Sequence, residues 1–259
     1  MQVKDIMTEP VTIDKSERIG HALDLMEKHD LRRLLVTNKD KLGGIITTRL
    51  IARVLGTRKS LGLPASSLHV ASATLDAVIK VRPDMSVEDA MVLLQKTSVL
   101  VAMEGDKIVG WVRPREVLAA VNIPGQAGDA MAVPLTVNAS DRLVHARRMM
   151  MDRDVGRLPV MENGRLVGIV TERDVARAMR AFRDLNETSS RQYARIYNIL
   201  VSDVMTQDVK YAYADTPLEE VKRIILAENR GGVPVLNRKE ELVGMITRRS
   251  LIDYLVRTR

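Results

Sequence analysis

The 259-residue chain contains no cysteine. This excludes disulfide scaffolds, zinc sites with thiolate ligands and thiol nucleophiles, and it is typical of a reducing compartment. Aromatic residues make up only 3% of the chain, so the core must be aliphatic. The same scarcity disfavours binding of single-stranded nucleic acid by base stacking on aromatic side chains.

Long apolar runs are also missing. No run approaches the roughly 20 residues that a membrane span requires, and the charged N-terminus lacks the apolar core of a signal peptide. We therefore expect a soluble, cytoplasmic protein with no membrane partner. Hydrophobic residues still make up 46% of the chain, which is enough for a sizeable core and argues against disorder.

Charge of one sign is not concentrated anywhere, although the net charge is +7. Residues 1–122 hold 18 basic against 15 acidic residues, and residues 123–259 hold 22 against 18. Without a basic tail, a well-solvated surface explains this surplus better than a polyanionic partner does.

The chain does contain an internal repeat. Three segments open with Asp-x-Met, at residues 5–7, 129–131 and 203–205. The glycine of a Gly-hydrophobic-hydrophobic-Thr motif follows each opening aspartate after 39, 39 and 41 residues, at Gly44, Gly168 and Gly244. A degenerate copy around Gly110 has lost the opening motif. We place the four repeats at residues 1–56, 71–122, 123–182 and 200–257.

Each repeat predicts the element order β-α-β-β-α, an α/β (α+β) fold class. In the third repeat, Asn163-Gly164 indicates a hairpin, and Thr171 begins an expected helix with acidic residues in its first turn. A unit of about 55 residues buries too little surface to be stable alone. We therefore expect the first repeat to pair with the second and the third with the fourth, as domains 1–122 and 123–259.

The third repeat carries Arg157-Leu158-Pro159-Val160, followed by Gly168-Ile169-Val170-Thr171-Glu172-Arg173-Asp174. In motif, order and spacing this pattern resembles the cystathionine-β-synthase (CBS) domain, and essentially the whole chain is similar to four CBS repeats. The resemblance implies two Bateman modules, which are pairs of repeats with pseudo-two-fold symmetry. Such modules commonly bind adenosine nucleotides in clefts between repeats and regulate another protein.

The Thr171–Asp174 pair suits a nucleotide on physical grounds as well. A helix N-terminus offers unpaired N–H groups to a phosphate, a threonine adds a hydroxyl, and a carboxylate three residues later can accept hydrogen bonds from ribose hydroxyls. Alternatively, Thr171 caps the helix and Asp174 complements the helix dipole. The family pattern favours the binding role.

The carboxylate position differs among the repeats. It holds Ser250 in the fourth repeat, Glu116 in the second and Leu50 in the first. We therefore rank the third repeat first as a binding site, then the fourth, the second and the first.

Two sets of site residues follow from the resemblance. The first cleft comprises Thr171, Arg173, Asp174, Val209, Lys210, Arg230, Gly231 and Val233. The second comprises Leu135, Thr136, Gly156, Arg157, Thr247, Arg248, Arg249 and Ser250. The implied ligand is AMP, ADP or ATP, with S-adenosylmethionine as an alternative.

Signals of catalysis are absent. The four histidines form no motif with a serine or an aspartate, and the chain has no HExxH, Walker A or GxGxxG pattern. The recurring Asp-x-Met openings favour a structural role such as capping over metal binding, and the 14 methionines favour core packing. We expect no catalytic residue and no metal.

These observations predict a non-catalytic protein that senses an adenosine nucleotide and regulates a separate polypeptide. The helix expected in the linker near residues 193–200 is a candidate relay. The alternative is a ligand-free structural or interaction module, with nucleic acid as a disfavoured partner. A homodimer and a disc formed by one chain both remain open.

Overall fold

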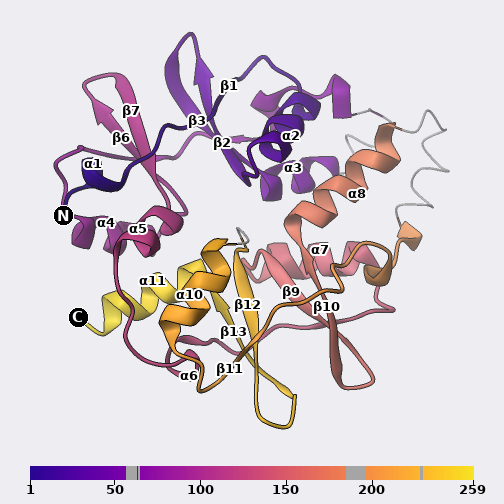
Figure 1. Ribbon diagram of the computed structural model, residues 1–259. Coiled ribbons are helices and arrows are strands. Elements are labelled where there is room, and N and C mark those ends of the chain that lie inside the picture. The colour runs from indigo at the N-terminus through magenta and orange to yellow at the C-terminus, as the bar shows by residue number, and fades with distance from the viewer. Residues whose placement is uncertain (57–62, 64, 185–196, 228–229) are drawn as a thin grey trace. The chain divides into compact units, whose positions relative to one another are not determined.

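The computed structural model describes residues 1–56, 63, 65–184, 197–227 and 230–259 (Figure 1). Residues 193–196, the first half of the candidate relay, lie outside these residues. Within the described part, no helix is both long and apolar enough to cross a membrane.

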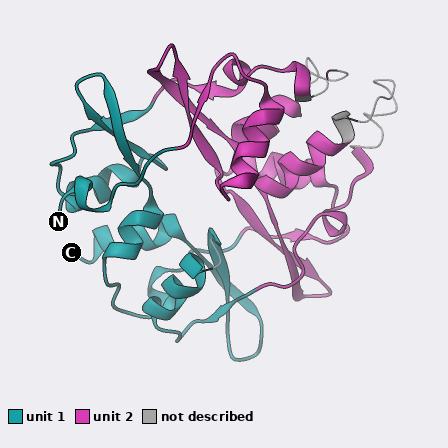
Figure 2. Cartoon of the chain, turned by 45° about the horizontal axis from the view of Figure 1, so that its top comes forward, with its two compact units in different colours: residues 1–10, 78–134, 210–259 teal, residues 11–77, 135–209 magenta. Residues whose placement is uncertain are grey.

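The chain folds into two compact units (Figure 2). Unit 1 comprises residues 1–10, 78–134 and 210–259, and unit 2 comprises residues 11–77 and 135–209. Unit 1 thus contains repeats 2 and 4, whereas unit 2 contains repeats 1 and 3. Each expected domain, 1–122 and 123–259, contributes one repeat to each unit. The expected pairing of repeat 1 with repeat 2 and of repeat 3 with repeat 4 stays a prediction.

The predicted order β-α-β-β-α is confirmed in every repeat. In unit 2, repeat 1 contains β1 (Thr12–Asp14), α2 (Ile19–Lys28), β2 (Arg33–Asn38), β3 (Lys41–Thr47) and α3 (Thr48–Leu55). Repeat 3 contains β8 (Val137–Asn138), α7 (Leu143–Asp152), β9 (Arg157–Glu162), β10 (Arg165–Thr171) and α8 (Glu172–Asp184).

Unit 1 repeats the pattern. Repeat 2 contains β5 (Ile79–Val81), α4 (Val87–Leu94), β6 (Leu100–Glu104), β7 (Lys107–Val112) and α5 (Pro114–Ala120). Repeat 4 contains β11 (Ala212–Tyr213), α10 (Leu218–Ala227), β12 (Gly232–Leu236), β13 (Leu242–Thr247) and α11 (Arg248–Arg257). Short helices lie in the segments before repeats: α1 (Val3–Ile6), η2 (Ala65–Ser67), η3 (Val70–Ala73), α6 (Ala127–Ala130) and η4 (Val201–Asp203).

Each sheet has the same topology. The first strand runs parallel to the second, and the second pairs antiparallel with the third, as in β8, β9 and β10. The helix between the first two strands provides the crossover that a parallel pair requires. Asn163 and Gly164 form the predicted two-residue turn with φ angles of 50° and 77°, which matches a hairpin turn with both central residues in the left-handed region.

Each unit has one aliphatic core to which both of its repeats contribute. In unit 2, Ile51 of α3 and Val175 of α8 belong to one buried cluster. In unit 1, Leu118 of α5 and Leu251 of α11 do the same. Packing of the two repeats within each unit buries the apolar face that a single repeat would leave in water.

The opening segment of each repeat lies on the sheet of another repeat. Residues 1–8 reach repeat 2, where Thr8 bridges Trp111, and β4 (Thr74–Leu75), from the opening of repeat 2, pairs with β3 of repeat 1. Likewise, Ala132 bridges Met245 of repeat 4, and Thr206 bridges Ile169 of repeat 3. Repeats 1 and 2 therefore exchange opening segments, as do repeats 3 and 4.

The aspartates of the three Asp-x-Met openings cap short helical turns, as the sequence indicated. The backbone N–H groups of Gln2, Gln126 and Leu200 donate to the carboxylates of Asp5, Asp129 and Asp203, at 2.7, 2.8 and 2.8 Å. The aspartates thereby satisfy amide groups that the turn leaves without backbone partners.

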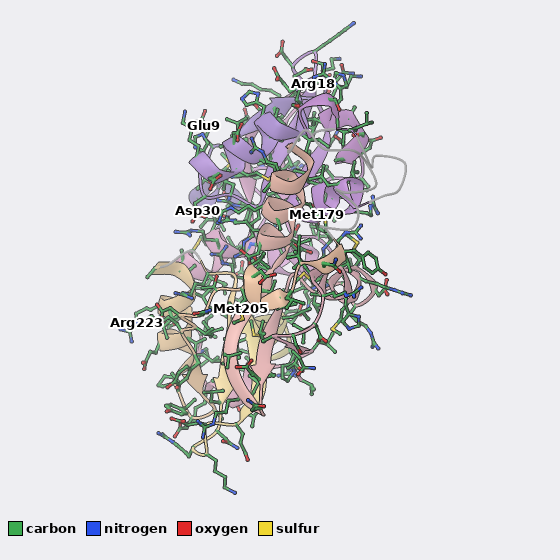
Figure 3. All side chains as sticks on the ribbon, turned by 90° about the vertical axis from the view of Figure 1, so that its right-hand side faces the viewer. Glu9, Arg18, Asp30, Met179, Met205 and Arg223 are labelled. Atoms are coloured by element: carbon green, nitrogen blue, oxygen red, sulfur yellow. The ribbon has the colours of Figure 1, made fainter. Side chains whose placement is uncertain are left out.

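The methionines of the same motif lie over the motif glycines. A Cβ atom added to Gly168 would lie 2.5 Å from the Sδ atom of Met205, and one added to Gly110 would lie 2.7 Å from that of Met7. Gly244 has the same relation to Met131. The glycine therefore gives the exchanged segment room to contact the strand, and Met205 is labelled beside this part of the sheet in Figure 3.

Candidate functional site

The predicted site turn of repeat 3 joins β10 to α8. The backbone N–H of Thr171 donates to Oδ2 of Asp174 at 2.8 Å, and the Thr171 hydroxyl donates to the same oxygen at 2.7 Å. The amide of Asp174 donates back to the Thr171 hydroxyl at 3.4 Å. The structure therefore brings the two residues together at the N-terminus of a 13-residue helix, where backbone N–H groups favour an anion.

The corresponding turn of repeat 4 has the same geometry without a charge. The amide of Thr247 donates to the Ser250 hydroxyl at 2.9 Å, and the amide of Ser250 donates to the Thr247 hydroxyl at 3.0 Å. A serine hydroxyl is a weaker acceptor than a carboxylate. The predicted rank of this repeat below repeat 3 has that physical basis.

Repeat 2 uses its charged pair internally. The Arg113 guanidinium donates to both carboxylate oxygens of Glu116, and the Arg113 amide donates to one of them at 2.8 Å. The Glu116 side chain is only 6% exposed, and the guanidinium also lies over the ring of Trp111, 4.4 Å from its centroid. The carboxylate at the site position of this repeat is thus already bound to Arg113.

Repeat 1 keeps only the threonine of the site turn. The amide of Leu50 donates to the Thr47 hydroxyl at 3.2 Å, which is an ordinary helix cap. Leu50 packs against the core of unit 2 and has no acceptor for a sugar.

The two residues inside the repeat 3 turn bind repeat 1. Arg173 donates to Asp30 at 2.6 Å and to the Leu31 carbonyl at 3.3 Å. Asp30 is labelled in Figure 3. Glu172 accepts from the guanidinium of Arg49, which also donates to Asp154. Arg173 is a predicted residue of the nucleotide site, whereas in this structure its guanidinium bonds to the neighbouring repeat.

Arg32 is a functional candidate that the sequence analysis missed. Burial lowers the pKa of its guanidinium, and the nearby positive charge of Arg173 lowers it further. Asp174 is among the carboxylates whose charge raises the same pKa. A cation of repeat 1 is therefore within electrostatic range of the site turn of repeat 3. No local motif around Arg32 indicated a role in the site, because its proximity to the site turn arises from the packing of two repeats that are far apart in sequence.

The remaining residues of the first predicted set divide between the units. Val209 belongs to unit 2, whereas Lys210, Arg230, Gly231 and Val233 belong to unit 1. The side chain of Val233 is fully buried in the core of unit 1. The carbonyl of Gly231 accepts a hydrogen bond from the Arg248 amide at 3.2 Å, so this glycine helps to hold the start of α11.

The second predicted set divides in the same way. Leu135, Thr136, Gly156 and Arg157 lie in unit 2, and Thr247, Arg248, Arg249 and Ser250 lie in unit 1. Leu135 packs partly buried against its core, and Thr136 is exposed. The Gly156 carbonyl accepts from the Glu172 amide at 3.2 Å. Arg249 donates to the Gln95 carbonyl at 2.8 Å.

Comparison with known families decides what these turns belong to. The CBS-domain model matches residues 3–57, 70–123, 127–181 and 201–257. The chain belongs to the CBS-domain family. Its four matched segments coincide closely with the four repeats found in the sequence, and each contains one β-α-β-β-α unit of the structure.

Two similar proteins match this chain over nearly its whole length and theirs. The uncharacterized protein MJ1225 of Methanocaldococcus jannaschii is 23% identical over 94% of this chain and 94% of its own. Its crystal structure covers 98% of this chain and 100% of that one with a TM-score of 0.86. A conserved protein from Pyrococcus horikoshii covers the same shares at 23% identity with a TM-score of 0.65. At these identities the likeness shows the fold.

A further relative matches only part of the chain. A CBS domain-containing protein of Dictyostelium discoideum is 33% identical over 47% of this chain and 84% of its own length.

In the part of this chain that the structure describes, no group of three or more histidine and acidic residues could hold a metal ion.

Proposed function

We propose that this CBS protein is a non-catalytic regulator that binds an adenosine nucleotide at the Thr171–Asp174 turn of repeat 3. The observation that carries the proposal is the pair itself, a threonine hydroxyl and a carboxylate held together at the start of α8. Both hydrogen bonds from Thr171 go to Oδ2 of Asp174, which leaves Oδ1 as the acceptor for a ribose hydroxyl.

A phosphate has two sources of stabilisation beside this turn. The N-terminus of α8 provides backbone N–H groups and the positive end of the helix dipole. The Arg32 guanidinium adds a positive charge. Burial and the charge of Arg173 lower its pKa, and an anion bound nearby would stabilise its charged form against both. AMP, ADP and ATP all carry such an anion, and S-adenosylmethionine is the alternative adenosine ligand. The contacts expected from repeat 4 stay predictions.

A regulatory role follows from the family resemblance, in which such modules control another protein. It is consistent with the description of the MJ1225 structure as that of a candidate archaeal homologue of γ-AMPK. The partner that this chain would regulate is a separate polypeptide, and the second site, around Thr247 and Ser250, is proposed as the weaker one.

Isothermal titration of the full chain with AMP, ADP, ATP and S-adenosylmethionine tests the proposal. Asp174→Ala should weaken binding of the preferred ligand about tenfold or more, since it removes a charged hydrogen-bond acceptor. Asp141→Ala is the matched control, because Asp141 accepts from the amide of Asn138 three residues earlier at the same 2.8 Å. Equal affinity in wild type and Asp174→Ala would refute the site. Failure of all four ligands to bind wild type would favour a ligand-free interaction module.

A further inference from the structure

Arg49 of α3, in repeat 1, bonds to two separate segments of repeat 3. Its Nε atom donates to Glu172, inside the proposed site turn, and its Nη1 atom donates to Asp154, in the loop before β9. The guanidinium also lies close to Gly156, since an added Cβ there would be 3.9 Å from Nη2 of Arg49. One side chain of repeat 1 therefore contacts both the helix start and the strand start of repeat 3.

The contact between Arg49 and Glu172 is more sheltered than an ordinary surface ion pair, whereas the Asp154 side chain is largely exposed. The side chains of Arg49 and Glu172 are 30% and 16% exposed. Burial lowers the pKa of Arg49, but the charges of Glu172 and Asp154 outweigh this effect and raise the pKa overall. The guanidinium is therefore charged at every physiological pH. Pairs of this kind contribute more than fully exposed ones, because water screens them less.

Glu172 would oppose an anionic ligand if Arg49 were absent. It is the first residue of α8, immediately after Thr171, so its carboxylate lies in the helix turn whose N–H groups suit a phosphate. Arg49 neutralises this carboxylate and holds it toward Asp154 and Gly156. The amide of Glu172 meanwhile donates to the Gly156 carbonyl, which fixes the direction in which the helix starts.

We propose that Arg49 is a positioning residue of the repeat 3 site, which acts through Glu172 and makes the nucleotide affinity of repeat 3 dependent on repeat 1. The inference rests on the proposed function. It gives repeat 1 a role in binding although Leu50 occupies its own carboxylate position. By thermodynamic linkage, a nucleotide at repeat 3 then strengthens the association of the two repeats in unit 2 by the same factor.

The experiment is a mutant cycle on the full chain with AMP as the titrant. Arg49→Ala should weaken AMP binding about tenfold, a typical coupling between linked sites. In the Glu172→Gln background, which has no carboxylate to neutralise, the further change Arg49→Ala should alter AMP affinity less than about twofold. Arg49→Lys keeps the charge but loses the planar fork, and it should fall between wild type and Arg49→Ala.

Arg177→Ala is the matched control. It removes an arginine–carboxylate pair between the same two repeats, with Glu27 of α2, that does not touch the site turn. It should leave AMP affinity within about twofold of wild type.

Three results would overturn the inference. One is equal AMP affinity in wild type and Arg49→Ala, and another is an equal effect of Arg49→Ala with and without Glu172. A loss in Arg177→Ala as large as that in Arg49→Ala would reduce Arg49 to a general packing role. In each of these cases wild type still binds AMP, so the proposed function stands. Failure of AMP, ADP, ATP and S-adenosylmethionine alike to bind wild type would remove both the inference and the proposed function.

Discussion

An arginine follows the helix-capping residue by two positions in all four repeats, as Arg49, Arg115, Arg173 and Arg249. Arg173 binds Asp30, just after α2, Arg49 binds Asp154, just after α7, and Arg249 binds the carbonyl of Gln95, at the end of α4. A cation near a helix C-terminus is favoured by the helix dipole. The family resemblance predicts Arg173 and Arg249 in the two nucleotide sites, whereas the helix ends that they contact belong to other repeats.

Arg32→Ala tests whether the phosphate meets the cation that local motifs did not reveal. We expect AMP affinity to fall about tenfold or more, because a hydrogen bond between charged groups is lost, while adenosine affinity changes less than about twofold. Titration calorimetry with both ligands measures the ratio. The adjacent Arg33→Ala is the control, and an unchanged ratio of AMP to adenosine affinity in Arg32→Ala would contradict the prediction.

At the scale of elements, local sequence patterns predicted the helices and strands of each repeat. They did not predict that the repeats exchange their opening segments. The hairpin at Asn163-Gly164 and the helix after Thr171 follow from turn chemistry and hydrophobic periodicity, both of which are properties of adjacent residues. The placement of residues 1–8 on β7 and of β4 on β3 depends on contacts between distant segments, and hydrophobic periodicity carries no information about such contacts. The constant Asp-x-Met and Gly motifs held the missing information, since the methionine of one repeat covers the glycine of another.

Gly168→Ala should therefore lower the free energy of unfolding by about 1–3 kcal/mol, the usual result of overpacking. The new methyl group would overlap Sδ of Met205, so that the opening segment of repeat 4 must shift. In a Met205→Ala background the same change should cost less than half as much, because the overlap is gone. Chemical denaturation of the four proteins gives the cycle. Additive losses would show that the methionine does not explain the glycine.

In the molecule as a whole, the four repeats share one fold but differ in their site turns. Repeat 3 has the complete turn, repeat 4 has a neutral version, repeat 2 has closed its own pair, and repeat 1 has only a cap. The sequence alone supports the ranking of the repeats as binding sites, since the residue at the carboxylate position differs among them. It could not show that the Glu116 carboxylate is bound by Arg113, because that depends on where the Arg113 side chain points.

Glu116→Gln separates stability from binding. Breaking this buried pair leaves the Arg113 charge uncompensated, and we expect a loss of about 3 kcal/mol in the free energy of unfolding. AMP affinity should stay within about twofold of wild type, because repeat 2 does not hold the proposed ligand. Denaturation and titration on the same preparation give both values, and a large loss of affinity in a folded protein would restore repeat 2 as a binding site.

The exchange of opening segments also bears on how the chain is made. During synthesis, repeat 1 leaves the ribosome without the strand that completes its sheet, because Thr74 and Leu75 are translated after the rest of it. Residues 1–8 are translated first, yet their partner Trp111 comes about a hundred residues later. Neither of the first two repeats can therefore finish folding before both have been translated, and such distant pairing slows folding. A nascent chain arrested between the first two repeats would expose the unpaired edge of β3, and such edges favour aggregation.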